Sequence, residues 1–141
     1  MRYVCDAPDG KTWFGMDSEA EAAAESDIMR HAVEKFFRVE KEKAARTYRS
    51  PLTNFVEQEI GLNAHLRREM PLFLTLRDGE GTALATAMLP SAGQGIRAFR
   101  PMIVGFENSD PYPAHGDAIK ALGKHFGIPL ERELCYPYTR R

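Results

Sequence analysis

The sequence predicts a single α+β domain: a mostly antiparallel sheet of about six strands packed against a long N-terminal helix and a C-terminal helix. Two pairs of alternating apolar and polar segments flank turn residues, which is typical of hairpins. Longer segments with apolar residues at helical spacing separate and follow them. No repeat or linker divides residues 1–141, so we expect one domain with the order β-β-α-α-β-β-β-α-β.

The N-terminus is predicted to form a hairpin. Residues 3–6 and 11–16 flank Ala7-Pro8-Asp9-Gly10, in which proline presets the turn and glycine accepts the left-handed conformation that closes it. Cys5 falls in the first strand and Cys135 in the last predicted one, which could be neighbours. Two cysteines without a secretion signal are more often reduced, so we expect free thiols.

Residues 18–48 are predicted to form one continuous helix. Ser18 and Glu21 have the spacing of a capping box, and apolar residues then share one face as far as Val39. Beyond Val39 that face is charged, and i,i+4 ion pairs become its main support. Because a helix of about 28 residues is about 42 Å long, we expect its end to project from the domain.

This projecting end is the predicted contact surface. Packing within one chain does not account for residues 40–48, which favours a protein partner or a second copy of the chain. An edge strand containing Pro101 is expected to contribute, because proline lacks the amide that a central strand would use. The candidate interface residues on the helix are Glu40, Lys41, Lys43, Arg46 and Tyr48.

A second helix and a second hairpin are predicted to follow. Ser50 and Pro51 suit a helix start, and apolar spacing continues to Gly61 and resumes as far as Met70. From residue 72 the period changes to two, and residues 78–81 turn the chain into a strand over residues 82–89. Its alanines 83, 85 and 87 make a smooth face on which we expect the long helix to pack.

The C-terminal part is predicted to contain an interrupted strand over residues 96–106, a helix and a final strand. The helix begins at Ala114 or Asp117 and ends at Phe126, with Gly127 as its cap and Pro129 as a stop. Residues 131–138 are then expected to form a short strand.

The charge balance disfavours nucleic acid and membrane as partners. The chain has 19 basic and 20 acidic side chains, so it offers no global field for phosphates. No stretch approaches the ~18 apolar residues of a membrane span, and we expect a cytoplasmic protein. Arg97, Phe99 and Arg100 could form a local nucleic-acid surface, but charges that protect an edge strand are the simpler explanation.

Residues 107–117 form the densest polar cluster and are the alternative functional site. Asp110, His115 and Asp117 could bind a ligand or provide an acid and a base, since loops between a strand and a helix often carry sites. They match no fixed-spacing signature, and a structural connection is favoured. The four histidines form no H-x-x-x-H or H-E-x-x-H pattern, so no metal is expected. No motif in the sequence indicates a cofactor, so none is expected either.

The element order from Ser50 to Tyr138 resembles that of the acetyltransferases that bind acetyl-coenzyme A: two helices, a three-stranded meander, a helix and a strand. Those enzymes hold the pyrophosphate on a Gln/Arg-x-x-Gly-x-Gly/Ala loop before a helix. Here the corresponding stretch is Pro113-Ala114-His115-Gly116-Asp117, with one glycine and one acidic residue. The resemblance implies acyltransferase-like topology without the usual phosphate loop.

Two functions therefore follow from the sequence. The leading hypothesis is a non-catalytic interaction or regulatory domain that binds a protein partner through the end of the long helix, with self-association as the simplest version. The alternative is a small-molecule-binding protein or an enzyme that uses residues 107–117.

Overall fold

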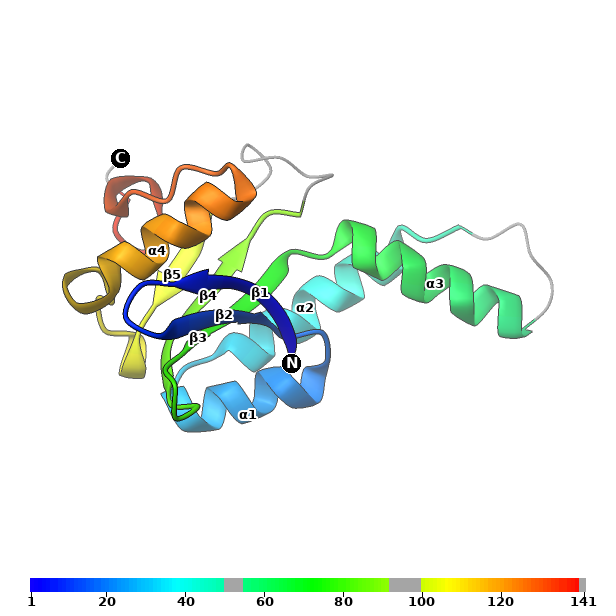
Figure 1. Cartoon of the computed structure of the whole chain (residues 1–141). Helices are drawn as coiled ribbons and strands as arrows, with labels where there is room; N and C mark the ends of the chain where they lie inside the picture. The colour runs from blue at the N-terminus through cyan, green and yellow to red at the C-terminus, as the bar shows by residue number, and fades with distance from the viewer. Residues whose placement is uncertain (50–54, 92–99, 140–141) are drawn as a thin grey trace.

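A computed structural model describes residues 1–49, 55–91 and 100–139 (Figure 1). Within these ranges the chain forms five strands and four α-helices: β1 (Arg2–Ala7), β2 (Lys11–Gly15), α1 (Glu19–Met29), α2 (Val33–Arg46), α3 (Phe55–Glu69), β3 (Leu72–Arg77), β4 (Ala83–Leu89), β5 (Met102–Val104) and α4 (Tyr112–Phe126). The strands make one antiparallel sheet in sequence order, β1-β2-β3-β4-β5. The predicted α+β class is confirmed.

Both predicted hairpins form, and their turns explain why. In the β1–β2 turn Asp9 and Gly10 have φ angles of 64° and 72°, which glycine and aspartate tolerate better than most residues. In the β3–β4 turn one carboxylate oxygen of Asp78 accepts hydrogen bonds from the amides of Glu80 and Thr82, each 2.9 Å long. These bonds are local, so short sequence patterns determine them.

Helices cover both faces of the sheet. On one face α4 packs over the alternate residues of β3 and β4, among them Leu74, Leu76, Ala85 and Ala87. The indole nitrogen of Trp13 donates a 2.8 Å hydrogen bond to the carbonyl oxygen of Ala118 in this layer. The alanine face therefore lies beneath α4, and its prediction as the seat of the N-terminal helix is wrong.

α1 and α2 cover the opposite face, where Phe73 and Met88 pack against Met16, Ala22, Val33 and Phe37. The predicted capping box starts α1, since the hydroxyl oxygen of Ser18 accepts a 3.2 Å bond from the amide of Glu21.

The N-terminal helical segment is two helices, so the prediction of one continuous helix is wrong. Arg30 adopts φ 54° and ψ 54°, which ends α1, and its amide donates to the carbonyl oxygen of Ser26. The hydroxyl oxygen of the same Ser26 then accepts a 2.9 Å bond from the amide of Glu34 in the first turn of α2. One serine thus satisfies backbone groups on both sides of the bend, which stabilises it.

The chain after α4 differs from the predicted sixth strand. Residues 132–134 form a 3-10 turn in which the amides of Leu134 and Cys135 bond to carbonyls three residues earlier. Only a parallel bridge between Met102 and Tyr136 joins this described segment to the sheet. β5 is an edge strand as predicted, but the amide of Tyr136 bonds to the carbonyl oxygen of Pro101 at 2.8 Å, so this edge is partly covered by the same chain.

The two cysteines lie toward opposite edges of the sheet and are not neighbours. Cys5 is in β1, whereas Cys135 precedes the residue that bridges to β5. Both are free thiols, as expected.

Candidate functional site

α3 runs outward from the body of the molecule, packed along the C-terminal half of α2 (Figure 1). We call residues 40–46 of α2 together with α3 the arm. Its two helices meet through small and polar groups. The Nε2 atom of His65 lies 2.9 Å from the carbonyl oxygen of Ala44, which can only accept, so Nε2 carries the proton. A Cβ atom at Gly61 would collide with the hydroxyl of Tyr48, so glycine permits this close approach.

A stripe of larger apolar residues lies on a different side of this helix from Gly61 and His65. At about 100° per residue, Phe55, Ile60 and Leu66 of α3 and the following Met70 fall within an arc of about 140°. Gly61 and His65 lie outside this arc, as do the half-buried Leu62 and Ala64. We call Phe55, Ile60, Leu66 and Met70 the apolar stripe. Phe55 is 77% exposed and Ile60 63% exposed, so the outer half of the stripe faces solvent.

The inner half of the stripe forms one wall of a groove. Leu66 and Met70 face a cavity of about 640 Å³ whose floor includes Met16, Phe37 and Phe73. We call this cavity the basal groove, because it lies where α3 leaves the body. Its volume is within the range of about 300–1,000 Å³ typical of binding sites.

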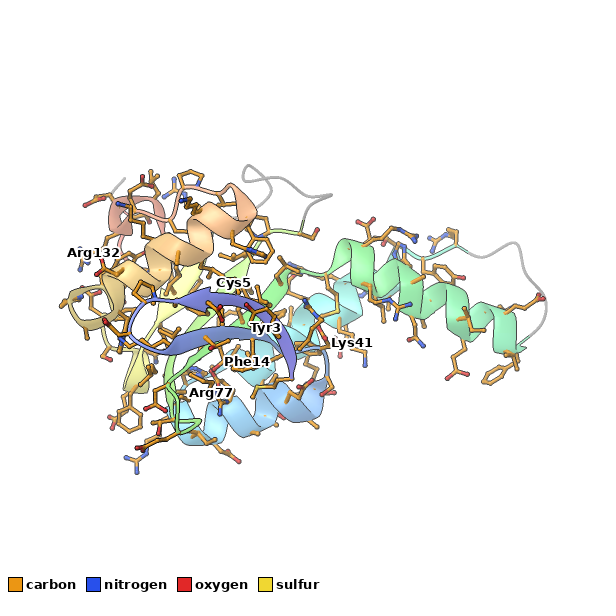
Figure 2. The ribbon with its side chains drawn as sticks, viewed as in Figure 1. Tyr3, Cys5, Phe14, Lys41, Arg77 and Arg132 are labelled. Carbon is orange, nitrogen blue, oxygen red and sulfur yellow. The ribbon has the colours of Figure 1, made fainter. Side chains whose placement is uncertain are left out.

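Charged side chains surround this groove. The guanidinium of Arg2 bonds both carboxylate oxygens of Asp17, at 3.1 and 3.2 Å. Figure 2 shows Lys41 on α2 near the base of α3, and Arg67 comes from α3 itself. Within the described ranges neither Lys41 nor Arg67 has an ion-pair partner. The groove is therefore apolar inside and positively charged at its rim.

The predicted interface residues fall around the arm but do not all face outward. Lys41 lines the basal groove. The ring of Tyr48 lies 5.2 Å from that of His65, so it packs within the arm. Glu40 pairs with Lys43 at 3.3 Å, and Arg46 approaches Glu42 at 4.0 Å.

α3 thus covers one side of residues 40–48, where Ala44 is buried and Tyr48 is half-buried, whereas Lys41, Lys43 and Arg46 remain exposed. The sequence alone does not indicate this contact, because His65 and Gly61, through which α3 meets this part of the chain, belong to no apolar periodicity. The apolar surface of the arm that remains exposed among the described residues lies on the outer half of α3.

The three candidate ligand residues in the 107–117 segment do not lie together in the structure. Asp110 accepts a 2.8 Å bond from Nε of Arg132 and a 3.0 Å bond from the amide of Tyr112, which fixes it at the start of α4. His115 and Asp117 instead line a separate pocket of about 170 Å³ beside the β1–β2 turn.

The chemistry of that pocket is limited. The Nδ1 atom of His115 lies 3.1 Å from Nζ of Lys11, so the lysine donates to a neutral imidazole. Burial and, to a lesser extent, the charge of Lys11 lower the pKa of His115. The pocket is smaller than the ~300 Å³ at the lower end of typical small-molecule sites.

A buried polar network beneath α1 was not predicted. Glu25 is completely buried, and its two carboxylate oxygens accept bonds from Nη2 of Arg77 at 2.8 Å and the hydroxyl of Thr86 at 2.6 Å. The Nε2 atom of His31 lies 2.8 Å from the same hydroxyl oxygen, and since that hydroxyl donates to Glu25, His31 donates to it. Arg77 is labelled in Figure 2.

This network fixes α1 on the sheet. Burial lowers the pKa of His31, which favours the neutral imidazole that the hydrogen bonds require. The sequence holds a signal for it, because Ala22, Glu25 and Met29 share one helical face and all are buried. A carboxylate on an apolar face indicates a buried partner, although the sequence does not name that partner.

Metal and membrane features are not found in the described part of the chain. No three metal-binding side chains gather there, and no helix is long and apolar enough to cross a bilayer. Arg100 is exposed, while Arg97 and Phe99 fall outside the described residues, as do Ser50 and Pro51.

Comparison of the chain with protein-family models, with curated proteins and with solved structures gives no match.

Proposed function

We propose that this chain is a non-catalytic interaction module that self-associates through its arm. The observation that carries the proposal is the exposed outer half of the apolar stripe. α3 uses small and polar groups to contact α2, so Phe55 and Ile60 remain available to a partner. Burying such a side chain contributes about 1.5–3 kcal/mol, which is a substantial driving force for association.

The marginal stability of α3 alone supports the same conclusion. It has 15 residues, and none of its described side chains is buried. Helices of about 12–15 residues are marginal in water without tertiary packing. A partner on the apolar stripe would supply that packing.

The charges of α3 favour a second copy as the partner. Glu59 lies in its outer half, whereas Arg67 and Arg68 lie in its inner half. Two such helices in antiparallel orientation place opposite charges together, and a two-fold axis makes both contacts at once.

The proposal also places the chain in the cytoplasm. The two free thiols suit a reducing compartment, where structural disulfides are rare. Its role there would be regulatory or architectural, through the assembly that the arm forms.

Analytical ultracentrifugation across the micromolar range tests self-association. We expect the wild-type chain to form a dimer and Ile60→Glu to be monomeric with an unchanged circular dichroism spectrum. Ile28→Glu is the matched control, because Ile28 is also more than half exposed but lies on α1. A wild-type chain that stays monomeric, or a dimer that Ile60→Glu leaves intact, would refute the proposal.

A further inference from the structure

We infer that the outer end of each arm inserts into the basal groove of the other copy, which makes the dimer reciprocal. This inference rests on the proposed self-association and adds its geometry. The two surfaces that it joins are the exposed Phe55 and Ile60 on one side and the groove between α3 and the body on the other.

The two surfaces match in polarity. Phe55 and Ile60 flank Glu59 along the outer half of α3. The groove offers an apolar floor, and at its rim Lys41 and Arg67 have no ion pair with any other described residue. In the proposed dimer, the apolar outer end of α3, with the carboxylate of Glu59, therefore meets the apolar floor of the groove and the cationic Lys41 and Arg67 at its rim.

One register satisfies these contacts together. About a two-fold axis, residues of two antiparallel helices face each other in pairs whose numbers have a constant sum. Placing Ile60 opposite the partner's Leu66 also places Glu59 opposite the partner's Arg67. The axis then passes through Asn63, which lies near the middle of the same arc of α3 and also lines the groove.

The same register carries Phe55 to the far end of the groove. Its position falls opposite the partner's Pro71, which lines the cavity next to Met70. Met70 also packs against the core cluster that contains Phe37 and Phe73. The inserted phenylalanine would thus extend the core of the other copy.

A cysteine at the two-fold axis tests the register. In a Cys5→Ala background, which removes the half-buried native thiol, Asn63→Cys is expected to form an intermolecular disulfide on mild oxidation. Arg68→Cys is the control, because it lies on the side of α3 away from the apolar stripe and should not cross-link.

A charge exchange tests the predicted pairing independently. Glu59→Arg and Arg67→Glu are each expected to weaken dimerisation ~10-fold or more, because each creates two like-charge contacts per dimer. The double variant should return to within a few-fold of wild type. Recovery in the double variant requires that the two side chains face each other.

The outcomes separate this inference from the proposed function. A dimer that Ile60→Glu disrupts, but that shows neither Asn63→Cys cross-linking nor charge-exchange recovery, overturns the register and leaves the arm as interface. A monomeric wild-type chain overturns both. If that monomer binds decanoate and Arg67→Glu abolishes the binding, the groove accepts a small anionic amphiphile in place of a second copy.

Discussion

Replacement of Arg77 by methionine is expected to destabilise the fold strongly. Glu25 is completely buried and Arg77 only 13% exposed, so the substitution leaves a carboxylate without its counter-charge inside the protein. It also removes the 3.1 Å bond from Nε of Arg77 to the hydroxyl of Thr75, which is itself buried. Breaking one side of a buried ion pair costs about 3–5 kcal/mol.

That loss is a large part of the stability of a typical domain, about 5–15 kcal/mol. For a chain of this size it corresponds to a fall in Tm of roughly 10–15 °C. Urea unfolding followed by circular dichroism measures the loss directly. The double variant Glu25→Met with Arg77→Met should be more stable than Arg77→Met alone, because no charge is then left unpaired.

The matched control is Arg38→Met. Arg38 pairs with Glu19 at 2.7 Å and Glu34 at 2.9 Å, but it is 49% exposed, so solvent screens both pairs. Its replacement should cost less than about 1 kcal/mol. Equal losses for Arg77→Met and Arg38→Met would refute the reasoning, since burial would then not determine the cost.

The remaining predictions concern histidines and the arm. Because burial lowers the pKa of His31 in the folded state, the unfolded chain binds more protons as pH falls below the ordinary value of about 6.5. The free energy of unfolding should therefore decrease from about pH 7 to pH 5, and His31→Gln should reduce this slope in urea titrations; an unchanged slope would contradict the assignment. His115→Gln should remove a further part of it, because the pKa of His115 is lowered as well. In the arm, Gly61→Ala should fail to give the ~1 kcal/mol gain expected in a helix, because its Cβ meets the hydroxyl of Tyr48, and thermal melts should show that gain only when Tyr48→Phe is added.

The elements that the sequence predicts well are those with local determinants. The β3–β4 turn depends on Asp78 and on amides two and four residues later, all within one short segment. The end of α4 likewise depends on Gly127, whose φ angle is 67°. In each case the pattern contains every group that the structure uses.

The bend between α1 and α2 has determinants that are distant in sequence. Arg30 is neither glycine nor asparagine, so no local signal indicates its left-handed conformation. What stabilises it is Ser26 on the other side of the bend and the bond between His31 and Thr86, 55 residues away. Periodicity across residues 28–36 continues through the bend and therefore predicts an unbroken helix.

The candidate ligand residues illustrate the same limit. Asp110 and His115 are only five positions apart in sequence. Asp110 binds Arg132 and His115 contacts Lys11, and because these partners are distant in the chain, the two side chains lie at different sites. For the arm, the sequence indicates that the end of the helical segment, residues 40–48, packs little within the chain. Most of these residues are exposed, but α3 covers one side of them and carries a further exposed apolar surface. The contacts of Gly61 and His65 leave no apolar pattern from which this could be predicted.

The strand order has a consequence for how the arm could vary. β2 and β3 are adjacent in the sheet, with Gly15 paired to Leu74, although all of α1, α2 and α3 lies between them in sequence. The segment from α1 to α3, which contains the arm, therefore begins and ends at neighbouring strands. Loop closure costs only about 0.6 kcal/mol for each doubling of length, so α3 could be lengthened, trimmed or exchanged while the sheet keeps its register. The sheet and α3 can therefore diverge in sequence and length at different rates.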